Sequence, residues 1–197
     1  MSNRALHDSA PGNMDLVPRR FRRGGGEMRY RHGIAVMRAQ PLHFGHCLII
    51  DQMLQNCQNV TILLGSCTES GTDKNPFTYL ERRIMLRNVY GKQFNIMGIE
   101  DIGRPDLWGK YVMGTVVSRY PLLPVPDAYY SGSAQDAALL MDLGVNLEIV
   151  GRDYLTGTNV RAMIKAFGAD WKQHTPKENH TLIANHIDKR IIKDAKT

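Results

Sequence analysis

Five short runs rich in β-branched and aromatic residues alternate with longer helical patterns along most of this chain. The runs occupy residues 33–37, 60–64, 94–99, 128–130 and 147–150. Helical patterns cover 45–56, 78–89, 106–119 and 134–143 between them, and two more follow at 159–167 and 178–193. This alternation is typical of βαβ units, in which crossover helices cover both faces of a parallel sheet. We therefore predict an α/β fold with an open, parallel, five-stranded sheet.

The composition fits one folded domain behind a basic leader. The 197 residues are 43% hydrophobic and 22% charged, which is a globular balance, and a domain of this size needs neither metal nor disulfide to fold. Residues 1–31 hold seven arginines against three acidic residues, so +4 of the net charge of +6 lies there. Because this segment shows no hydrophobic periodicity, we predict a disordered basic leader at 1–28 and a folded domain at 29–197 that includes the C-terminal helix.

Cysteine usage and hydropathy predict a cytoplasmic protein. The three cysteines lie ten residues apart and form no CxxC pair, a pattern that favours a reducing compartment. No stretch approaches the ~18 apolar residues that a membrane span requires, and the first thirty residues contain no apolar signal segment. We expect no membrane partner, and contact with nucleic acid only through the basic leader.

A pair of histidines follows the first predicted strand and opens a helix in the string Pro41-Leu42-His43-Phe44-Gly45-His46. Free N–H groups at a helix start, two imidazoles and a glycine that permits close backbone approach form a cradle for an anion such as phosphate. Two other interpretations stay open. A zinc site would need more ligands than the neighbouring Cys47 offers, and both rings could be hydrogen-bonded core histidines.

A second predicted helix start, near the other end of the chain, also has features that suit an anion. Thr156-Gly157-Thr158 supplies small residues whose N–H groups can face an anion, and Arg161 reaches the same place from one turn into the helix. The alternative is an ordinary capped helix with an exposed arginine. Ligands of open α/β sheets bind at the carboxyl ends of the strands, where both strings are expected to lie.

The two strings resemble the (H/T)xGH and SGTxxR motifs of the nucleotidyltransferase superfamily. The segments between them are similar to those of the archaeal-type nicotinamide mononucleotide adenylyltransferases, from about Gly33 to Pro176. Leu64-Gly65-Ser66 is similar to the family's IGS, the string from Asn75 to Arg82 to its (N/D)PFTxxER, and Asp101-Ile102 with Trp108 to its DIxxNxxW. Tyr130-Ser131-Gly132 is similar to the start of its YSGN, Arg152-Asp153 to its RD, and Asp170-Trp171 to its DW.

The resemblance implies a Rossmann-like fold of nucleotidyltransferase type and transfer of AMP from ATP to nicotinamide mononucleotide, forming NAD and pyrophosphate. It implies catalytic roles for Arg38, His43, His46 and Arg161. Contacts to ATP are implied for Gln40, Pro41, Gly45, Gly151, Thr156, Gly157, Thr158 and Val160, and contacts to the acceptor for Asp101, Trp108, Ser131, Gly132 and Arg152. It also implies a homo-oligomer of NAD biosynthesis in which Mg²⁺ accompanies ATP without a dedicated protein ligand.

Two of these segments also have plain structural interpretations. Thr78 and Glu81 stand at the spacing of a capping box, and Arg82 could simply pair with Glu81 or another acidic neighbour. At helical spacing from Tyr111 and Val112, Trp108 could belong to the core instead of stacking on a base.

Three positions depart from the family's pattern. Met37 stands where the family has a glycine, and Pro105 and Ser133 stand where it has asparagines. Proline offers a carboxamide no side-chain hydrogen bond. Two alternatives therefore stay open: a nucleotidyltransferase with a different phosphate acceptor, and a non-catalytic nucleotide sensor or RNA-binding protein. The RTEGISTT-like run of cytidylyltransferases and the TxxNGH start of phosphopantetheine adenylyltransferases are both missing from the sequence.

Overall fold

A computed structural model describes residues 28–151, 156–166 and 168–194, with side chains described as far as residue 188. Five strands form one parallel sheet in the order β3-β2-β1-β4-β5. The strands are β1 (Tyr30–Met37), β2 (Cys57–Leu64), β3 (Asn95–Gly98), β4 (Ala128–Ser131) and β5 (Asn146–Ile149). The predicted fold class is confirmed. The predicted leader lies outside the described residues except for Met28.

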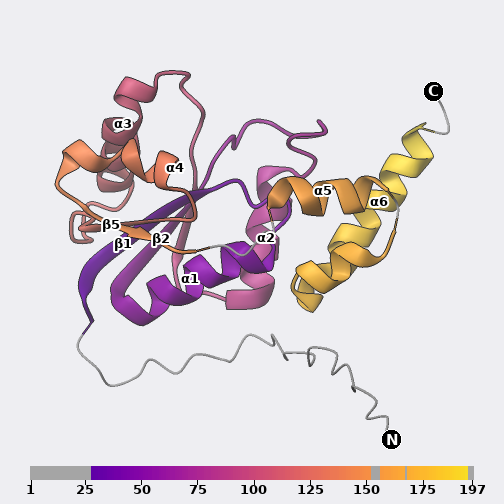
Figure 1. Ribbon diagram of the computed structural model, residues 1–197, viewed down its shortest axis with the longest axis horizontal. Helices are drawn as coiled ribbons and strands as arrows, with labels where there is room; N and C mark the ends of the chain where they lie inside the picture. Colours follow the sequence, from indigo (N-terminus) through magenta and orange to yellow (C-terminus); the bar gives the residue numbers. More distant parts are fainter. Residues whose placement is uncertain (1–27, 152–155, 167, 195–197) are drawn as a thin grey trace, which may run out of the picture.

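Helices cover both faces of the sheet (Figure 1). On one face lie α1 (Phe44–Asn56) and α2 (Tyr79–Tyr90), and on the other lie α3 (Pro105–Arg119) and α4 (Ala134–Ala138). α5 (Gly157–Lys165) and α6 (His180–Asp194) share the core of α1 and α2 and lie beyond them, beside the sheet. Three short 3₁₀ helices, η1 (Met141–Leu143), η2 (Asp170–His174) and η3 (Lys177–Asn179), complete the elements. Within the described residues no helix is long and apolar enough to cross a membrane.

The central strands are buried on both faces, which explains their nearly continuous apolar sequence. Ile34 and Leu63 pack into the core beneath α3 and α4, whereas Ala35 and Ile62 pack into the core beneath α1 and α2. Successive side chains of a strand point to opposite faces, so each strand supplies both cores. This double covering holds the strand ends, and the groups that follow them, in fixed positions.

Most predicted boundaries agree with the observed ones to within two residues, and the larger differences are at the starts of β1 and β2, which both begin three residues early, and in the fourth predicted helix. β1 begins three residues earlier than predicted, because the carboxylate of Asp127 accepts the N–H groups of Arg31 (3.1 Å) and His32 (2.9 Å) and extends the ordered strand. The fourth predicted helix divides into α4 and η1. Leu140 and Leu143 both pack into the core from this segment, and their spacing of three residues suits a 3₁₀ turn.

His32 is a buried neutral histidine that makes the fold sensitive to acid. It is 0% exposed, and its Nδ1 lies 2.7 Å from the carbonyl oxygen of Pro124, so Nδ1 is the donor. Its Nε2 then accepts from the hydroxyl of Thr61 at 2.9 Å. Burial lowers the pKa of His32 below its ordinary value of 6.5, while the Pro124 carbonyl and Asp127 oppose this shift.

The expected result is a loss of stability as the pH falls below 6.5. The unfolded chain then binds a proton that the folded chain rejects, so the free energy of unfolding decreases by up to ~1.4 kcal/mol per pH unit from this group. Urea unfolding at pH 7 and pH 5 measures this slope in the wild type and in His32→Gln. The variant should show the smaller loss on acidification, and equal slopes would contradict the prediction.

Candidate active site

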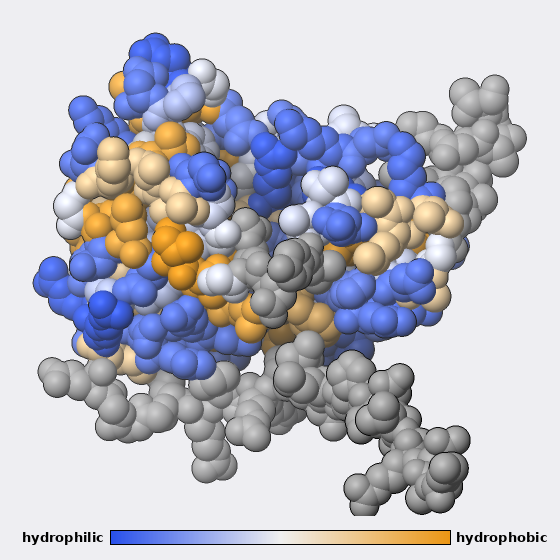
Figure 2. Space-filling model, in the orientation of Figure 1, coloured by the Kyte–Doolittle hydropathy of each residue, from blue (hydrophilic) through white to orange (hydrophobic). Residues whose placement is uncertain are grey.

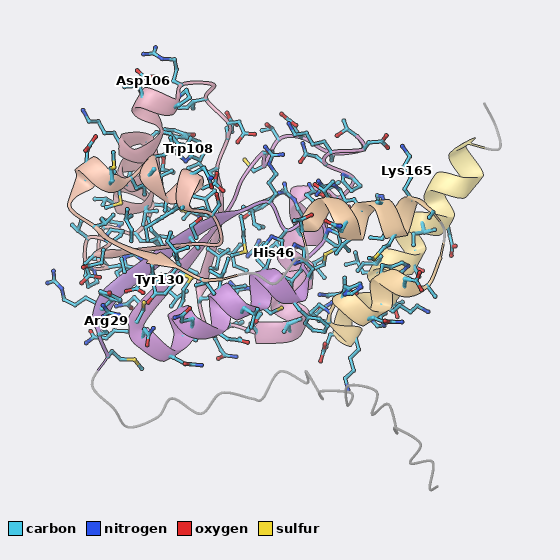
Figure 3. All side chains as sticks on the ribbon, in the orientation of Figure 1. Arg29, His46, Asp106, Trp108, Tyr130 and Lys165 are labelled. Atoms are coloured by element: carbon cyan, nitrogen blue, oxygen red, sulfur yellow. The ribbon has the colours of Figure 1, made fainter. Side chains whose placement is uncertain are left out.

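A cavity of about 690 Å³ opens at the carboxyl ends of the central strands. β1 is the point where the strand order reverses, since β2 and β3 lie on one side of it and β4 and β5 on the other. Such switch points are where open α/β sheets bind ligands. The wall combines the turn after β1, the starts of α1 and α5, the segment 101–105, α3 and the end of β4. His46 and Trp108 reach it from helices on opposite faces of the sheet (Figure 3).

His43 and His46 open α1, and backbone N–H groups fix the tautomers of both rings. His43 is the N-cap, and its Nδ1 accepts from the N–H of Gly45 at 3.1 Å. The N–H of His43 donates in turn to Nδ1 of His46 at 3.4 Å. An Nδ1 that accepts carries no proton, so in each neutral ring the proton sits on Nε2. The rings stack with centroids 3.8 Å apart and present two N–H donors at a helix N-terminus, which suits an anion.

The start of α5 lies close to the histidine pair. Thr156 caps this helix by accepting the N–H of Asn159 at 3.3 Å. A Cβ on Gly157 would lie 3.4 Å from Nε2 of His43 and 3.2 Å from Nη1 of Arg161, so a glycine here keeps open the space between the two groups. Nη2 of Arg161 donates to the hydroxyl of Thr158 at 3.0 Å. The two predicted phosphate motifs thus meet at one place.

The same region carries converging positive charge. Burial, and then the like charge of Arg38, lower the pKa of Arg161, which stays charged at neutral pH because it starts from 12.5. Both guanidinium groups line the cavity together with the histidines. An anion with several oxygens would relieve this repulsion by accepting hydrogen bonds from both arginines. Among the residues that the structure describes, no three His, Cys, Asp or Glu side chains come together as a metal site.

A buried arginine holds the turns that follow β1 and β2. Arg82 is 0% exposed and donates from Nη1 to the carbonyl oxygens of Arg38 (2.9 Å) and Gly65 (2.7 Å). The residues that follow these two carbonyls, Ala39 and Ser66, both have a φ of +48°, which is rare for residues other than glycine. Arg82 makes these carbonyl contacts instead of the alternative pairing with Glu81, and Glu81 accepts from the N–H of Thr78 in a capping box.

The side chain of Gln40 is occupied by the protein itself. Its Oε1 accepts the N–H of Phe77 at 2.8 Å and its Nε2 donates to the carbonyl of Phe77 at 2.9 Å. A cis peptide bond joins Gln40 to Pro41. The carbonyl oxygen of Gln40 accepts from Nη1 of Arg161 at 3.4 Å, so this residue ties the turn after β1 both to the start of α2 and to α5.

The other half of the cavity contains the predicted acceptor residues. Asp101, Trp108, Ser131 and Gly132 all line it. The indole of Trp108 is half-buried, and its ring centroid lies 5.9 Å from that of Tyr111. Oδ2 of Asp101 accepts from the hydroxyl of Ser66 at 2.5 Å. An aromatic ring, a carboxylate and the end of β4 therefore line the same cavity as the cationic groups.

Some predicted site residues do not line the cavity. Val160 is 0% exposed and belongs to the core. Pro41, Gly45 and Gly151 are not among the described residues that line the cavity, and Arg152 lies outside the described residues. Gly45 still acts on the site, because its N–H binds the ring of His43.

The sequence pattern missed several residues that line the cavity. They are Val36, Arg104, Tyr129, Asp136 and Leu139. Leu139 is 41% exposed at the end of α4. Hydrophobic surface gathers over α4, whereas the surface of the segment between β2 and α2 is hydrophilic (Figure 2). The signal that could have found Asp136 is its place three residues after Ser133, which caps α4 at the end of β4.

Comparison with known proteins places the chain in a family. Residues 35–168 match the cytidylyltransferase-like family, so the chain belongs to that family and is a nucleotidyltransferase. Curated relatives carry a more specific name. A nicotinamide-nucleotide adenylyltransferase of Methanothrix thermoacetophila is 28% identical over 74% of this chain and 85% of the relative. A protein of the same name from Thermoplasma volcanium is 30% identical over 71% of this chain and 78% of the relative.

Solved structures show the same fold. A bifunctional NMN adenylyltransferase/ADP ribose pyrophosphatase from Francisella tularensis superposes with a TM-score of 0.70 at 19% identity, covering 84% of this chain. The same protein complexed with AMP and a manganese ion superposes with a TM-score of 0.67 at 20% identity. This chain spans only about half of that bifunctional protein, 52% and 51% in the two structures.

Proposed function

We propose that this protein transfers the adenylyl group of ATP to nicotinamide mononucleotide and forms NAD and pyrophosphate. The observation that carries the proposal is the convergence of His43, His46, Arg38 and Arg161 on one cavity that Asp101 and Trp108 also line. The first group suits a triphosphate and the second a flat base with an N–H donor. The names of the relatives support this choice of substrates.

The reaction needs positioning and charge stabilisation more than acid–base chemistry. An oxygen of the acceptor's phosphate attacks the α-phosphorus of ATP in line, the bond from that phosphorus to the bridging oxygen breaks, and pyrophosphate leaves with the electron pair. The attacking phosphate is already ionised, so no protein base is required. Nε2–H of His46 donates to the bridging oxygen as its charge develops, and Arg161 holds the β- and γ-phosphates with the N–H groups of α5.

The remaining groups align the two substrates. Arg38 lies between ATP and the acceptor's phosphate, where its charge offsets their mutual repulsion. Mg²⁺ enters as part of the substrate, bound to the triphosphate oxygens of ATP. The manganese ion bound with AMP by the Francisella protein supports a metal-assisted reaction of this class. We also retain the prediction that the chain forms a homo-oligomer.

The acceptor's base occupies the side of Asp101 and Trp108. The indole stacks on the pyridine ring, and the carboxylate accepts an N–H of the carboxamide. Pro105 is the first residue of α3 and Ser133 caps α4, so neither supplies the amide that the family's asparagines would. This difference keeps a second candidate in view, a nucleotidyltransferase of the same mechanism with another mononucleotide as its acceptor.

The test is a product assay with ATP, Mg²⁺ and nicotinamide mononucleotide. NAD and pyrophosphate should appear in equal amounts, and label on the α-phosphate of ATP should pass into NAD. Other mononucleotides, with nicotinate mononucleotide among them, are assayed in parallel. Product with another mononucleotide but not with nicotinamide mononucleotide would favour the second candidate. ATP binding without any product would overturn adenylyl transfer.

A further inference from the structure

Ser66 is a strained, buried residue directly beneath the acceptor side of the cavity. It is 2% exposed and has a φ of +48° in the left-handed region. It is not among the described residues that line the cavity, so its side chain reaches the site only through a neighbour. That neighbour is Asp101, whose Oδ2 accepts the Ser66 hydroxyl at 2.5 Å. The two residues follow different strands and are brought together by the sheet.

The unusual backbone of Ser66 is held from both sides. Arg82 donates to the carbonyl oxygens of Gly65 (2.7 Å) and Ser66 (3.0 Å). The N–H of Cys67 donates to the carbonyl oxygen of Ile99 at 3.2 Å, which fixes the turn to the segment that leads into Asp101. A strained residue persists only where its surroundings over-determine it, and such residues cluster at functional sites. Here the left-handed backbone of Ser66 directs its hydroxyl toward the carboxylate of Asp101.

The hydrogen bond from Ser66 makes the two carboxylate oxygens of Asp101 unequal as acceptors. One of the two acceptor sites of Oδ2 of Asp101 is engaged by Ser66, which makes Oδ1 the more available oxygen for an N–H of a ligand in the cavity. A hydrogen bond also fixes the rotation of the carboxylate, so less conformational freedom is lost when a ligand binds. A carboxylate free to rotate would offer the same charge without a fixed direction.

A second negative charge lies on the same side of the cavity. Asp136 also lines the cavity, as does Tyr129. Burial, and then the charge of Asp136, raise the pKa of Tyr129, which agrees with this placement. The guanidinium of Arg104 also lines the cavity, but Asp106 engages it through two hydrogen bonds of 2.9 and 2.7 Å. The two carboxylates therefore favour a neutral base with N–H donors and repel a base that carries a carboxylate of its own.

We propose that Ser66 is a positioning residue for the acceptor, which turns Asp101 so that the site takes a base bearing a carboxamide and disfavours one bearing a carboxylate. This inference rests on the proposed function, because it assumes that the base of a mononucleotide occupies the Asp101 side. It adds a residue outside the cavity wall to the specificity of the site. It also gives a functional reason for the left-handed backbone of Ser66 after β2.

The test compares Ser66→Ala and Ser66→Gly with the wild type. Glycine adopts the left-handed conformation without strain, so Ser66→Gly keeps the fold while removing the hydroxyl. Binding of nicotinamide mononucleotide without ATP is followed through the fluorescence of Trp108, with the buried Trp171 as a constant background. Both variants should weaken binding about tenfold, because the carboxylate of Asp101 is no longer held in place and must be ordered when the ligand binds. The KM for the acceptor should rise by the same factor, with kcat and the KM for ATP little changed.

Two controls separate positioning from general damage. Ser118→Ala removes an exposed hydroxyl of α3 outside this cavity and should leave acceptor binding unchanged. In an Asp101→Asn background, Ser66→Gly should have a smaller effect than in the wild type, because its action passes through Asp101. The preference for nicotinamide over nicotinate mononucleotide should also fall in both Ser66 variants.

The outcomes distinguish the two proposals. If the wild type neither binds nor converts nicotinamide mononucleotide, the proposed function fails and this inference fails with it. If the wild type converts it and both Ser66 variants bind it with unchanged affinity, only the inference is overturned. A fall in kcat with unchanged KM for the acceptor would also overturn it, since that result would place the effect of Ser66 in the transfer step.

Discussion

Replacing His46 by alanine is expected to lower kcat by at least ~100-fold, the usual loss when a preorganised donor to developing charge is removed. The donor is preorganised because the N–H of His43 binds Nδ1 of His46 and leaves the proton on Nε2. The ring stacks on His43 and is 8% exposed, so it cannot turn freely. The loss should fall on kcat more than on the KM for ATP, because the bridging oxygen gains its charge only in the transition state.

The measurement is steady-state kinetics with both substrates varied, together with the thermal stability of each protein. His174→Ala is a matched control, because His174 lies on η2 and is not part of the cavity wall. It should retain wild-type turnover. His46→Gln keeps an N–H donor without the ring and should recover part of the lost rate. Wild-type turnover by His46→Ala would remove His46 from the mechanism.

The parts of this structure that follow from local sequence could be predicted. The five-stranded parallel sheet follows from short apolar runs that alternate with helical patterns, because burial on both faces demands such runs. The histidine pair and the start of α5 were recognisable because their chemistry belongs to single helix starts, where residues close in sequence stay close in space. The capping box of Thr78 and Glu81 was predictable for the same reason.

The parts that depend on distant contacts could not be predicted. Ser66 and Asp101 lie 35 residues apart and meet only because β2 and β3 pair in the sheet. The plain structural interpretation of Arg82 was an acidic partner, which is the common arrangement on a helix surface. The fold instead brings it beneath the strand ends, where backbone carbonyls are its acceptors. Gln40 follows a strand that leads into the site, yet the position of Phe77 decides where its amide points.

The same distant contacts predict that Arg82→Leu lowers the free energy of unfolding by about 3 kcal/mol, a large share of the roughly 5–15 kcal/mol of a typical domain. Burial removes water from the guanidinium and lowers the pKa of Arg82 in the folded protein. Replacing Arg82 by leucine removes this desolvation cost. This gain is outweighed because the carbonyl oxygens of Arg38 and Gly65 lose their guanidinium donors, at roughly 1–3 kcal/mol each. Ala39 and Ser66 also lose the contacts that hold their left-handed turns.

Urea unfolding measures the loss, and Arg83→Leu is the matched control because the neighbouring Arg83 is exposed. The control should remain within about 0.5 kcal/mol of the wild type. Arg82→Lys keeps the charge but lacks the planar fork that reaches several carbonyls at once, so its stability should fall between those of Arg82→Leu and the wild type. Equal stability of Arg82→Leu and Arg83→Leu would show that the turns hold without the guanidinium. A loss in Arg82→Lys as large as that in Arg82→Leu would mean that geometry, and not charge, is what the strand ends require of this residue.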